Sequence, residues 1–174
     1  MFKTSLLARI AIASGALFIA GNACAETGYV AELGVGHLSG KEVHKGGNTD
    51  SSIELNAAFG VEFDDGLGAR VVALGDAKPF RGLWSTDRSF DNFIGVEATG
   101  SYEIAPKLNL KGGLGIGRSN LDEGVDDAHK LIADGLVSVG LQYRFARHYA
   151  MELRVDHLTS SGVTSAGVQF QIPF

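Results

Sequence analysis

The chain of 174 residues has one cysteine and, beyond its first 25 residues, no helical stripe of apolar side chains. The missing stripe argues against a helical domain, because an amphipathic helix repeats its apolar residues every three or four positions. An apolar run near the start, Ile10 to Ala20, has roughly a dozen residues, which is too few for a transmembrane helix. The fold must therefore be sought in strands.

Residues 1–25 are typical of a cleaved signal peptide, with a basic start, the apolar run and the small-x-small sequence Ala23-Cys24-Ala25. We expect cleavage after Ala25, which leaves residues 26–174 as a single domain without cysteine, and so without disulfide or thiol chemistry. A lipoprotein signal also ends at a cysteine, but Gly21 stands where such signals usually carry leucine.

Removing residues 1–25 takes away Lys3 and Arg9 and no acidic residue, so the formal net charge changes from −5 to −7. This acidic balance argues against nucleic acid as a partner, because nucleic-acid-binding proteins present basic surfaces. It is compatible with export and identifies no ligand.

Alternation of apolar and polar residues with a period of two dominates residues 26–174, and glycine is abundant. A period of two is that of a β-strand with two different faces. The pattern predicts eight strands at roughly residues 28–38, 51–63, 67–77, 92–104, 107–118, 132–145, 149–158 and 163–174.

Short and long connections mostly alternate between the predicted strands. The short ones are residues 64–66, 105–107, 146–148 and 159–162, in which Asp, Gly and Pro favour tight turns. The long ones are residues 39–50, 78–91 and 119–131. This order predicts an up-and-down meander with the long loops at one end and both termini at the other.

One face of the predicted strands carries large apolar side chains, and the opposite face is polar and rich in glycine. A soluble barrel would turn the apolar face inward, whereas a membrane barrel turns it toward lipid. A small eight-stranded barrel has little interior room, so the glycine-rich face fits the inside. Aromatic residues near strand ends fit the girdles of a membrane barrel: Phe63, Tyr102, Phe145, Tyr149 and Phe174.

The sequence therefore predicts an all-β fold, a closed eight-stranded antiparallel up-and-down transmembrane β-barrel. An unpaired strand edge is costly in hydrocarbon, so the last strand must pair with the first. The chain can then end inside a strand, as its final residues "AGVQFQIPF" do. A soluble barrel stays as an alternative, but it leaves the terminal aromatic unexplained.

The signal peptide, the eight strands, "GLQYRF" (140–145) and "YAMELRVDHL" (149–158) resemble outer-membrane barrel proteins of the OmpA/OmpX type. The resemblance implies the outer membrane of a Gram-negative bacterium, periplasmic termini, and outer-membrane lipid and lipopolysaccharide as partners. It further implies that Phe170, Ile172 and Phe174 form a signal read by the barrel-assembly machinery. Pro173 departs from the usual pattern because it lacks the N–H of one ladder bond.

Charged residues on the polar face are expected to meet inside the barrel. They could form an ion path or, as the narrow interior favours, a plug of salt bridges. The predicted network consists of Glu32, Glu54, Arg70, Glu97, Lys111, Arg144, Glu152, Arg154 and Asp156.

"DHLTSSG" (156–162) offers a candidate catalytic pair, His157 and Thr159. The stretch is similar to outer-membrane lipid A deacylases, which are also eight-stranded barrels with a His-x-Ser pair on the outer wall. In that family His157 would match the general base and Thr159 would stand in place of the nucleophilic serine. The family's catalytic acid corresponds to Thr164, which is a neutral residue. Two of the three catalytic residues of that family, the nucleophile and the acid, therefore differ in this chain.

The predicted loops carry weaker candidates. Asp122, Glu123, Asp126, Asp127 and His129 form an acidic loop whose spacing does not follow the twelve-residue calcium loop. Lys41, His44 and Lys45 could meet lipopolysaccharide phosphates, and loops 39–50, 78–91 and 119–131 could bind a surface ligand. We expect no metal and no cofactor.

The leading hypothesis is an outer-membrane barrel without enzymatic activity, which has a structural or surface-interaction role and no open pore. The alternatives are a lipid A-modifying ester hydrolase at His157 and a narrow pore.

Overall fold

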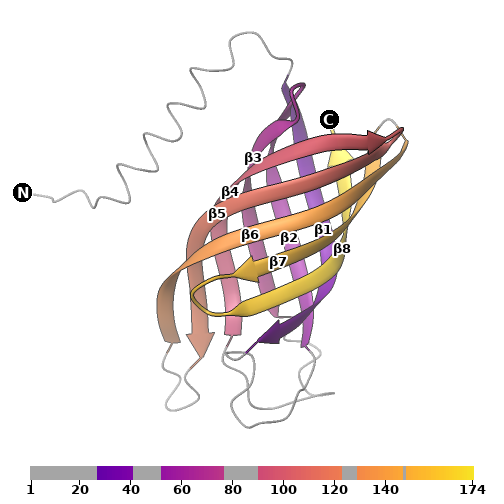
Figure 1. Cartoon of the computed structure of the whole chain (residues 1–174). Helices are drawn as coiled ribbons and strands as arrows, with labels where there is room; N and C mark the ends of the chain where they lie inside the picture. Colours follow the sequence, from indigo (N-terminus) through magenta and orange to yellow (C-terminus); the bar gives the residue numbers. More distant parts are fainter. Residues whose placement is uncertain (1–26, 41–51, 77–89, 123–128, 147) are drawn as a thin grey trace, which may run out of the picture.

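The computed structural model describes residues 27–40, 52–76, 90–122, 129–146 and 148–174 (Figure 1). All eight predicted strands are present: β1 (Thr27–Gly40), β2 (Ser52–Phe63), β3 (Leu67–Asp76), β4 (Phe90–Ala105), β5 (Leu108–Asp122), β6 (His129–Ala146), β7 (Tyr149–Leu158) and β8 (Val163–Pro173). Each strand pairs antiparallel with the next, and β8 pairs with β1. The predicted closed meander is confirmed. None of the described segments forms a helix that could cross a bilayer.

The barrel closes on β1, which pairs with β2 on one side and β8 on the other. Leu33, for example, lies opposite Ala57 and Phe170. The last residue takes part in this ladder, since Phe174 N donates to Tyr29 O at 2.9 Å and Tyr29 N to Phe174 O at 3.0 Å. The chain thus stays paired to its final residue, which satisfies backbone groups that a bilayer could not.

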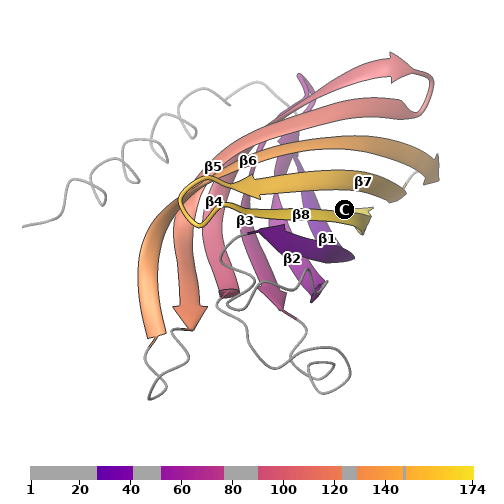
Figure 2. The same ribbon diagram turned by 60° about the horizontal axis from the view of Figure 1, so that its bottom comes forward.

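The tight turns after β2, β4 and β6 lie at the same end of the barrel as the chain's carboxyl terminus, the upper end in Figure 1. Two of these turns use left-handed backbone, at Gly66 (φ 81°) and at Lys107 (φ 69°). The ends of β1, β3 and β5 and the β7–β8 turn at residues 159–162 lie at the other end, seen from a second side in Figure 2.

Strands extend further toward the long-loop end than predicted. β5 runs to Asp122 and β6 begins at His129, so most of the predicted loop 119–131 is strand, and β4 begins at Phe90, inside the predicted loop 78–91. The boundaries were missed because apolar side chains there lie on both faces, which removes the alternation. Leu121, for example, is buried, whereas Leu131 is exposed.

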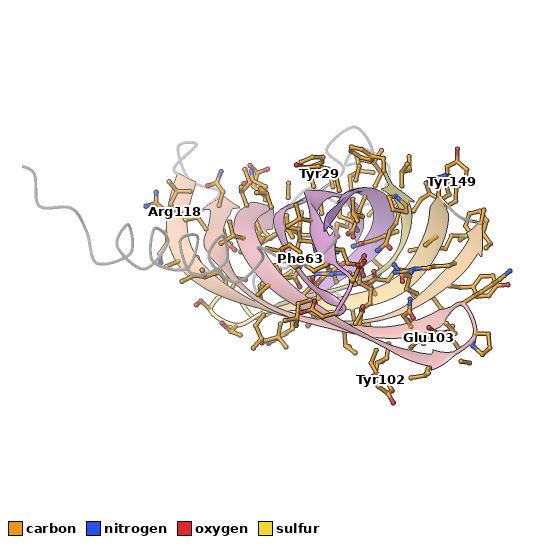
Figure 3. The ribbon with its side chains drawn as sticks, turned by 90° about the horizontal axis from the view of Figure 1, so that it is seen from above. Tyr29, Phe63, Tyr102, Glu103, Arg118 and Tyr149 are labelled. Atoms are coloured by element: carbon orange, nitrogen blue, oxygen red, sulfur yellow. The ribbon has the colours of Figure 1, made fainter. Side chains whose placement is uncertain are left out.

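The apolar face points outward along the strands. Leu33, Leu114 and Leu153 are each 60% or more exposed, an arrangement that suits lipid and not water. Tyr102 and Tyr149 are also exposed, and Figure 3 shows Tyr102 directed away from the barrel. Phe63 was predicted as a girdle residue, but it is only 8% exposed and therefore does not belong to an exposed aromatic girdle.

Candidate functional site

The barrel interior holds a group of charged side chains that are at most 8% exposed. They come from six strands: Glu32, Glu54, Arg70, Glu97, Lys111, Glu152, Arg154 and Asp156. All eight belong to the predicted lumen network. Buried charges need partners or counterions, so their contacts decide what the interior can do.

Arg70 on β3 joins the first two carboxylates. Its Nε donates to Glu97 Oε2 at 2.7 Å, from the residue directly opposite on β4, and its Nη1 donates to Glu32 on β1. Glycine makes the room, because a Cβ on neighbouring Gly60 would lie 2.5 Å from Arg70 Cβ. One guanidinium thus compensates two carboxylates.

Arg154 on β7 reaches Glu97 from the other side of the lumen. Its Nη2 lies 3.0 Å from both oxygens of Glu97, and its Nε donates to Asp156 at 2.7 and 2.8 Å. The Ser138 hydroxyl donates to Glu97 as well. A Cβ on Gly113 would lie 2.0 Å from Glu97 Oε1, so the absence of a side chain at Gly113 makes room for this carboxylate. Glu97 therefore bridges two arginines across the barrel.

Amide side chains continue the network toward the short-turn end. Gln171 donates to Glu32 at 3.0 Å and also to Glu152, Gln142 donates to Gln171, and Asn109 donates to Gln142 at 2.7 Å. This chain of amides lies between the arginines and the short-turn end.

The mouth at the short-turn end is more open. Arg144 lies there with its side chain 52% exposed, and its Nη2 is 3.6 Å from Glu62 Oε1. Lys111, deeper inside, lies 3.9 Å from Glu62 and 4.0 Å from Glu152. Arg144 is thus exposed at the mouth and connects to the buried group only through Glu62, among the ion pairs of the described residues.

A vestibule of about 470 Å³ opens at this mouth, lined by Glu62, Tyr102, Asn109, Gln142, Arg144 and Gln171 among others. Beside Arg70 and Lys111 only about 10 Å³ is left in a second cavity. The interior therefore narrows from a wet vestibule to space for about one water molecule.

The long-loop end of the interior is apolar, which the sequence reasoning missed. The buried cluster consists of Leu38, Val72, Leu74, Phe90, Phe93, Leu121, Leu136, Leu158 and Val163. The ring of Phe93 covers two glycines, since Cβ atoms on Gly95 and Gly117 would lie 2.5 and 2.6 Å from its Cζ. A signal was present, because Leu38 and Leu158 occupy the polar phase of their strands.

Asp134 on β6 ties the β7–β8 turn to the barrel. Its carboxylate accepts hydrogen bonds from Ser160 N at 2.7 Å, Ser161 N at 3.2 Å and Ser161 Oγ at 2.6 Å. The Ser119 hydroxyl on β5 adds a fourth at 2.8 Å. Four donors satisfy a carboxylate that is only 2% exposed, and they link two strands, β5 and β6, to one turn.

His157 faces outward near the long-loop end and is exposed. Its Nδ1 lies 2.9 Å from Thr164 Oγ1, the residue directly opposite on β8. Thr159 lies instead in the turn, where its N donates to Gly135 O and its hydroxyl lies over Gly135. The residue at the position of the family's acid is thus the partner of His157, and it is a neutral hydroxyl.

Two aromatic clusters surround the end of β8 on the outer surface. Phe174 lies 6.1 Å from Tyr29 and 6.2 Å from Phe59, measured between ring centroids. Phe170 lies 5.6 Å from Tyr149 and 6.1 Å from Phe145. Ile172, between the two phenylalanines, is 39% exposed.

Several predicted features lie outside the described residues: the signal peptide, Lys41, His44, Lys45, Glu123, Asp126 and Asp127, and the side chains of Asp122 and His129. Within the part of the chain that the structure describes, no three His, Cys, Asp or Glu side chains are grouped to hold a metal ion.

No protein-family model and no curated protein matches this sequence. Solved structures do match. The chain is 14% identical to neisserial surface protein A (TM-score 0.56), with 86% of this chain and 99% of that chain covered. It is 12% identical to the N-terminal β-barrel domain of Pseudomonas aeruginosa OprF (TM-score 0.58), with the same coverage. It is 15% identical to the Yersinia pestis outer membrane protein Ail in a phospholipid bilayer nanodisc (TM-score 0.53), covering 86% and 100%.

These similarities show that the chain has the eight-stranded outer-membrane β-barrel fold, as the sequence predicted. Identities of 12–15% carry the fold alone, because one fold hosts many functions.

Proposed function

We propose that this chain is an integral outer-membrane barrel with a structural or surface-interaction role, a closed interior and no enzymatic activity. The observation that carries the proposal is the contrast between the two faces of its strands. Leu33, Leu114 and Leu153 outside are each 60% or more exposed. Arg70, Arg154 and Glu97 inside are 8% exposed or less and bonded to one another. Lipid outside and paired charges inside account for both.

The barrel itself is tested by heat-dependent gel mobility of the membrane-extracted protein. A closed barrel resists detergent until it is boiled, so unheated and heated samples should migrate differently. Recovery of the protein in the soluble periplasmic fraction would contradict the proposal.

A closed interior is supported by two successive layers, the ion-pair network and the apolar cluster that contains Phe93 and Leu136. Purified protein added to planar bilayers should therefore produce no single-channel currents. Current steps that disappear in the heat-unfolded sample would favour the narrow pore.

The outward apolar band fits outer-membrane lipid, and the long-loop end fits contact with lipopolysaccharide, so we place loops 39–50, 78–91 and 119–131 outside and both termini in the periplasm.

Phe170, Ile172 and Phe174 alternate on the outer face of the last strand and are proposed to serve barrel assembly. Phe174→Ala should lower the amount of heat-modifiable barrel in cells, whereas Tyr102→Ala, an exposed aromatic on β4, should leave it unchanged.

A second candidate, lipid A ester hydrolysis, rests on the hydrogen bond between His157 Nδ1 and Thr164 Oγ1. A hydroxyl bonded to an outward imidazole is the arrangement of a nucleophile and its base. Mass spectra of lipid A should be compared for cells that express wild type, His157→Ala and the control His148→Ala, an exposed histidine before β7. The hydrolase is established if lipid A loses an acyl chain in cells that express wild type or His148→Ala but not in cells that express His157→Ala. Identical lipid A in all three strains would rule out the hydrolase.

A further inference from the structure

The buried charges of the interior do not balance. In the buried part of the lumen network, five carboxylates (Glu32, Glu54, Glu97, Glu152 and Asp156) accompany three cations (Arg70, Lys111 and Arg154), which is an excess of two negative charges, and Asp76, Asp91 and Asp134 are further buried carboxylates of the barrel. Every cation already has carboxylate partners. Excess buried charge needs a proton or a counterion, because an isolated carboxylate is costly in a low dielectric.

Glu54 is the carboxylate that the cations do not reach. It is fully buried, and its partners within the described chain are uncharged: Asn56 Nδ2 donates to its Oε1 at 3.1 Å, and the Ser165 side chain hydrogen-bonds to it. Its other oxygen, Oε2, has no hydrogen-bond partner. Glu54 therefore supplies a negative charge and an open acceptor.

Two amide oxygens near Glu54 also lack donors. Asn56 Oδ1 and Gln169 Oε1 have no partner, although the side chains are only 7% and 4% exposed. The Asn56 amide is oriented by the bond from its nitrogen to Glu54, so its oxygen is directed elsewhere. Three oxygens of three buried side chains thus lack any donor.

Glycine lets the two amides pack against the same stretch of β1. Gly34 on β1 lies between Asn56 on β2 and Gln169 on β8 in the ladder, and a Cβ at Gly34 would lie 2.3 Å from Asn56 Oδ1 and 2.8 Å from Gln169 Cγ. Gly36, the next inward residue of β1, lies opposite Glu54. The three side chains that carry these acceptors therefore lie next to Gly34 and Gly36, a stretch of β1 without side chains.

We propose that the barrel interior binds a hard, oxygen-seeking cation, Na⁺ or Ca²⁺, at Glu54, Asn56 and Gln169. Such ions take carboxylate and amide-carbonyl oxygens as ligands, and here they would meet acceptors without competing donors. The cation would also remove part of the excess negative charge. Its binding would stabilise the folded barrel, since the unfolded chain holds no such site.

The test uses the full-length protein refolded in detergent, with tetramethylammonium chloride as the only salt at mildly alkaline pH. NaCl or CaCl₂ then replaces this salt at constant ionic strength while the thermal unfolding midpoint is measured. We expect a saturable rise with at least one of the two ions, and at about 100 times its Kd the folding equilibrium constant should increase about 100-fold. The ion that acts identifies the ligand.

Glu54→Gln should abolish the cation response, because it removes the charge and keeps the size. The control Glu103→Gln, which changes an exposed carboxylate at the mouth (Figure 3), should keep it. Gln169→Glu should lower the Kd for Ca²⁺ at least tenfold by adding a second carboxylate.

Retention of radiolabelled sodium or calcium by refolded wild type gives a direct measurement of ion binding even if a variant does not fold.

The proposal is overturned if wild type shows neither a saturable response nor retained label, or if Glu54→Gln responds as wild type does. It is also overturned if the thermal unfolding midpoint of wild type rises on acidification but does not change with Na⁺ or Ca²⁺. Protons would then be what neutralises the interior. The barrel proposal survives each of these outcomes, since a stable barrel is their common starting point.

Discussion

At the level of single residues, the interior depends on side chains that are paired and on glycines that leave them room. Glu97 receives Arg70 from β3 and Arg154 from β7, and Gly113 beside it has no side chain to interfere. These pairs are buried, so removing one partner costs more than the pair contributes.

Arg70→Ala tests this dependence. It leaves Glu32 and Glu97 without their shared cation, and we expect the free energy of unfolding to fall by about 3–5 kcal/mol. Arg144→Ala is the control, because that side chain is half exposed and its ion pair should be worth at most about 1 kcal/mol. Urea unfolding of refolded barrels measures both values. A similar loss of unfolding free energy in the two variants would mean that the buried ion pairs stabilise the barrel no more than the exposed one does.

Gly117→Ala tests the space that glycine provides. The new methyl group would lie 2.6 Å from the Phe93 ring and 2.3 Å from Ile94 O, so both the ring and the backbone must shift. Overpacking of this kind costs about 1–3 kcal/mol. Gly112→Ala, where the nearest atom is 3.8 Å away, should be nearly neutral in the same urea titration. Equal stability of the two variants would show that Phe93 moves freely.

At the level of elements, the sequence predicted the strands well where one face was apolar and the other polar. β7 was predicted with both its bounds, and its burial alternates without interruption. Toward the long-loop end the rule failed, because Leu38, Phe93 and Leu136 place apolar side chains inside as well as outside. The lumen network was predictable as a set of inward residues, but its pairings depend on register between strands distant in sequence, which alternation alone does not give.

The β7–β8 turn offers a prediction about a single element. Asp134→Ala removes the acceptor of Ser160 N and Ser161 N, so these amides should exchange with solvent at least tenfold faster in native-state hydrogen exchange. Thr159 N donates to Gly135 O and does not use the carboxylate, so its exchange should change little. Uniformly faster exchange at all three amides would indicate general destabilisation and not the loss of this tie.

At the level of the whole molecule, the two ends of the barrel differ in chemistry. The short-turn end opens into a polar vestibule that contains Arg144 and Glu62, whereas the other end is filled by the apolar cluster and closed on one side by the turn that Asp134 holds. A vestibule open to one side and closed to the other makes the direction of insertion important, because it decides which compartment meets the polar mouth.

That direction is testable with single cysteines, because the only cysteine of the chain, Cys24, lies in the predicted signal peptide. Asp64→Cys marks the short-turn end and Ser160→Cys the β7–β8 turn, and both native side chains are exposed. With periplasmic termini, a thiol reagent that cannot cross the outer membrane should label Ser160→Cys in intact cells and Asp64→Cys only after permeabilisation. Wild type, treated in parallel, reports any labelling of Cys24. Labelling of Asp64→Cys alone in intact cells would reverse the orientation and place the vestibule on the cell surface.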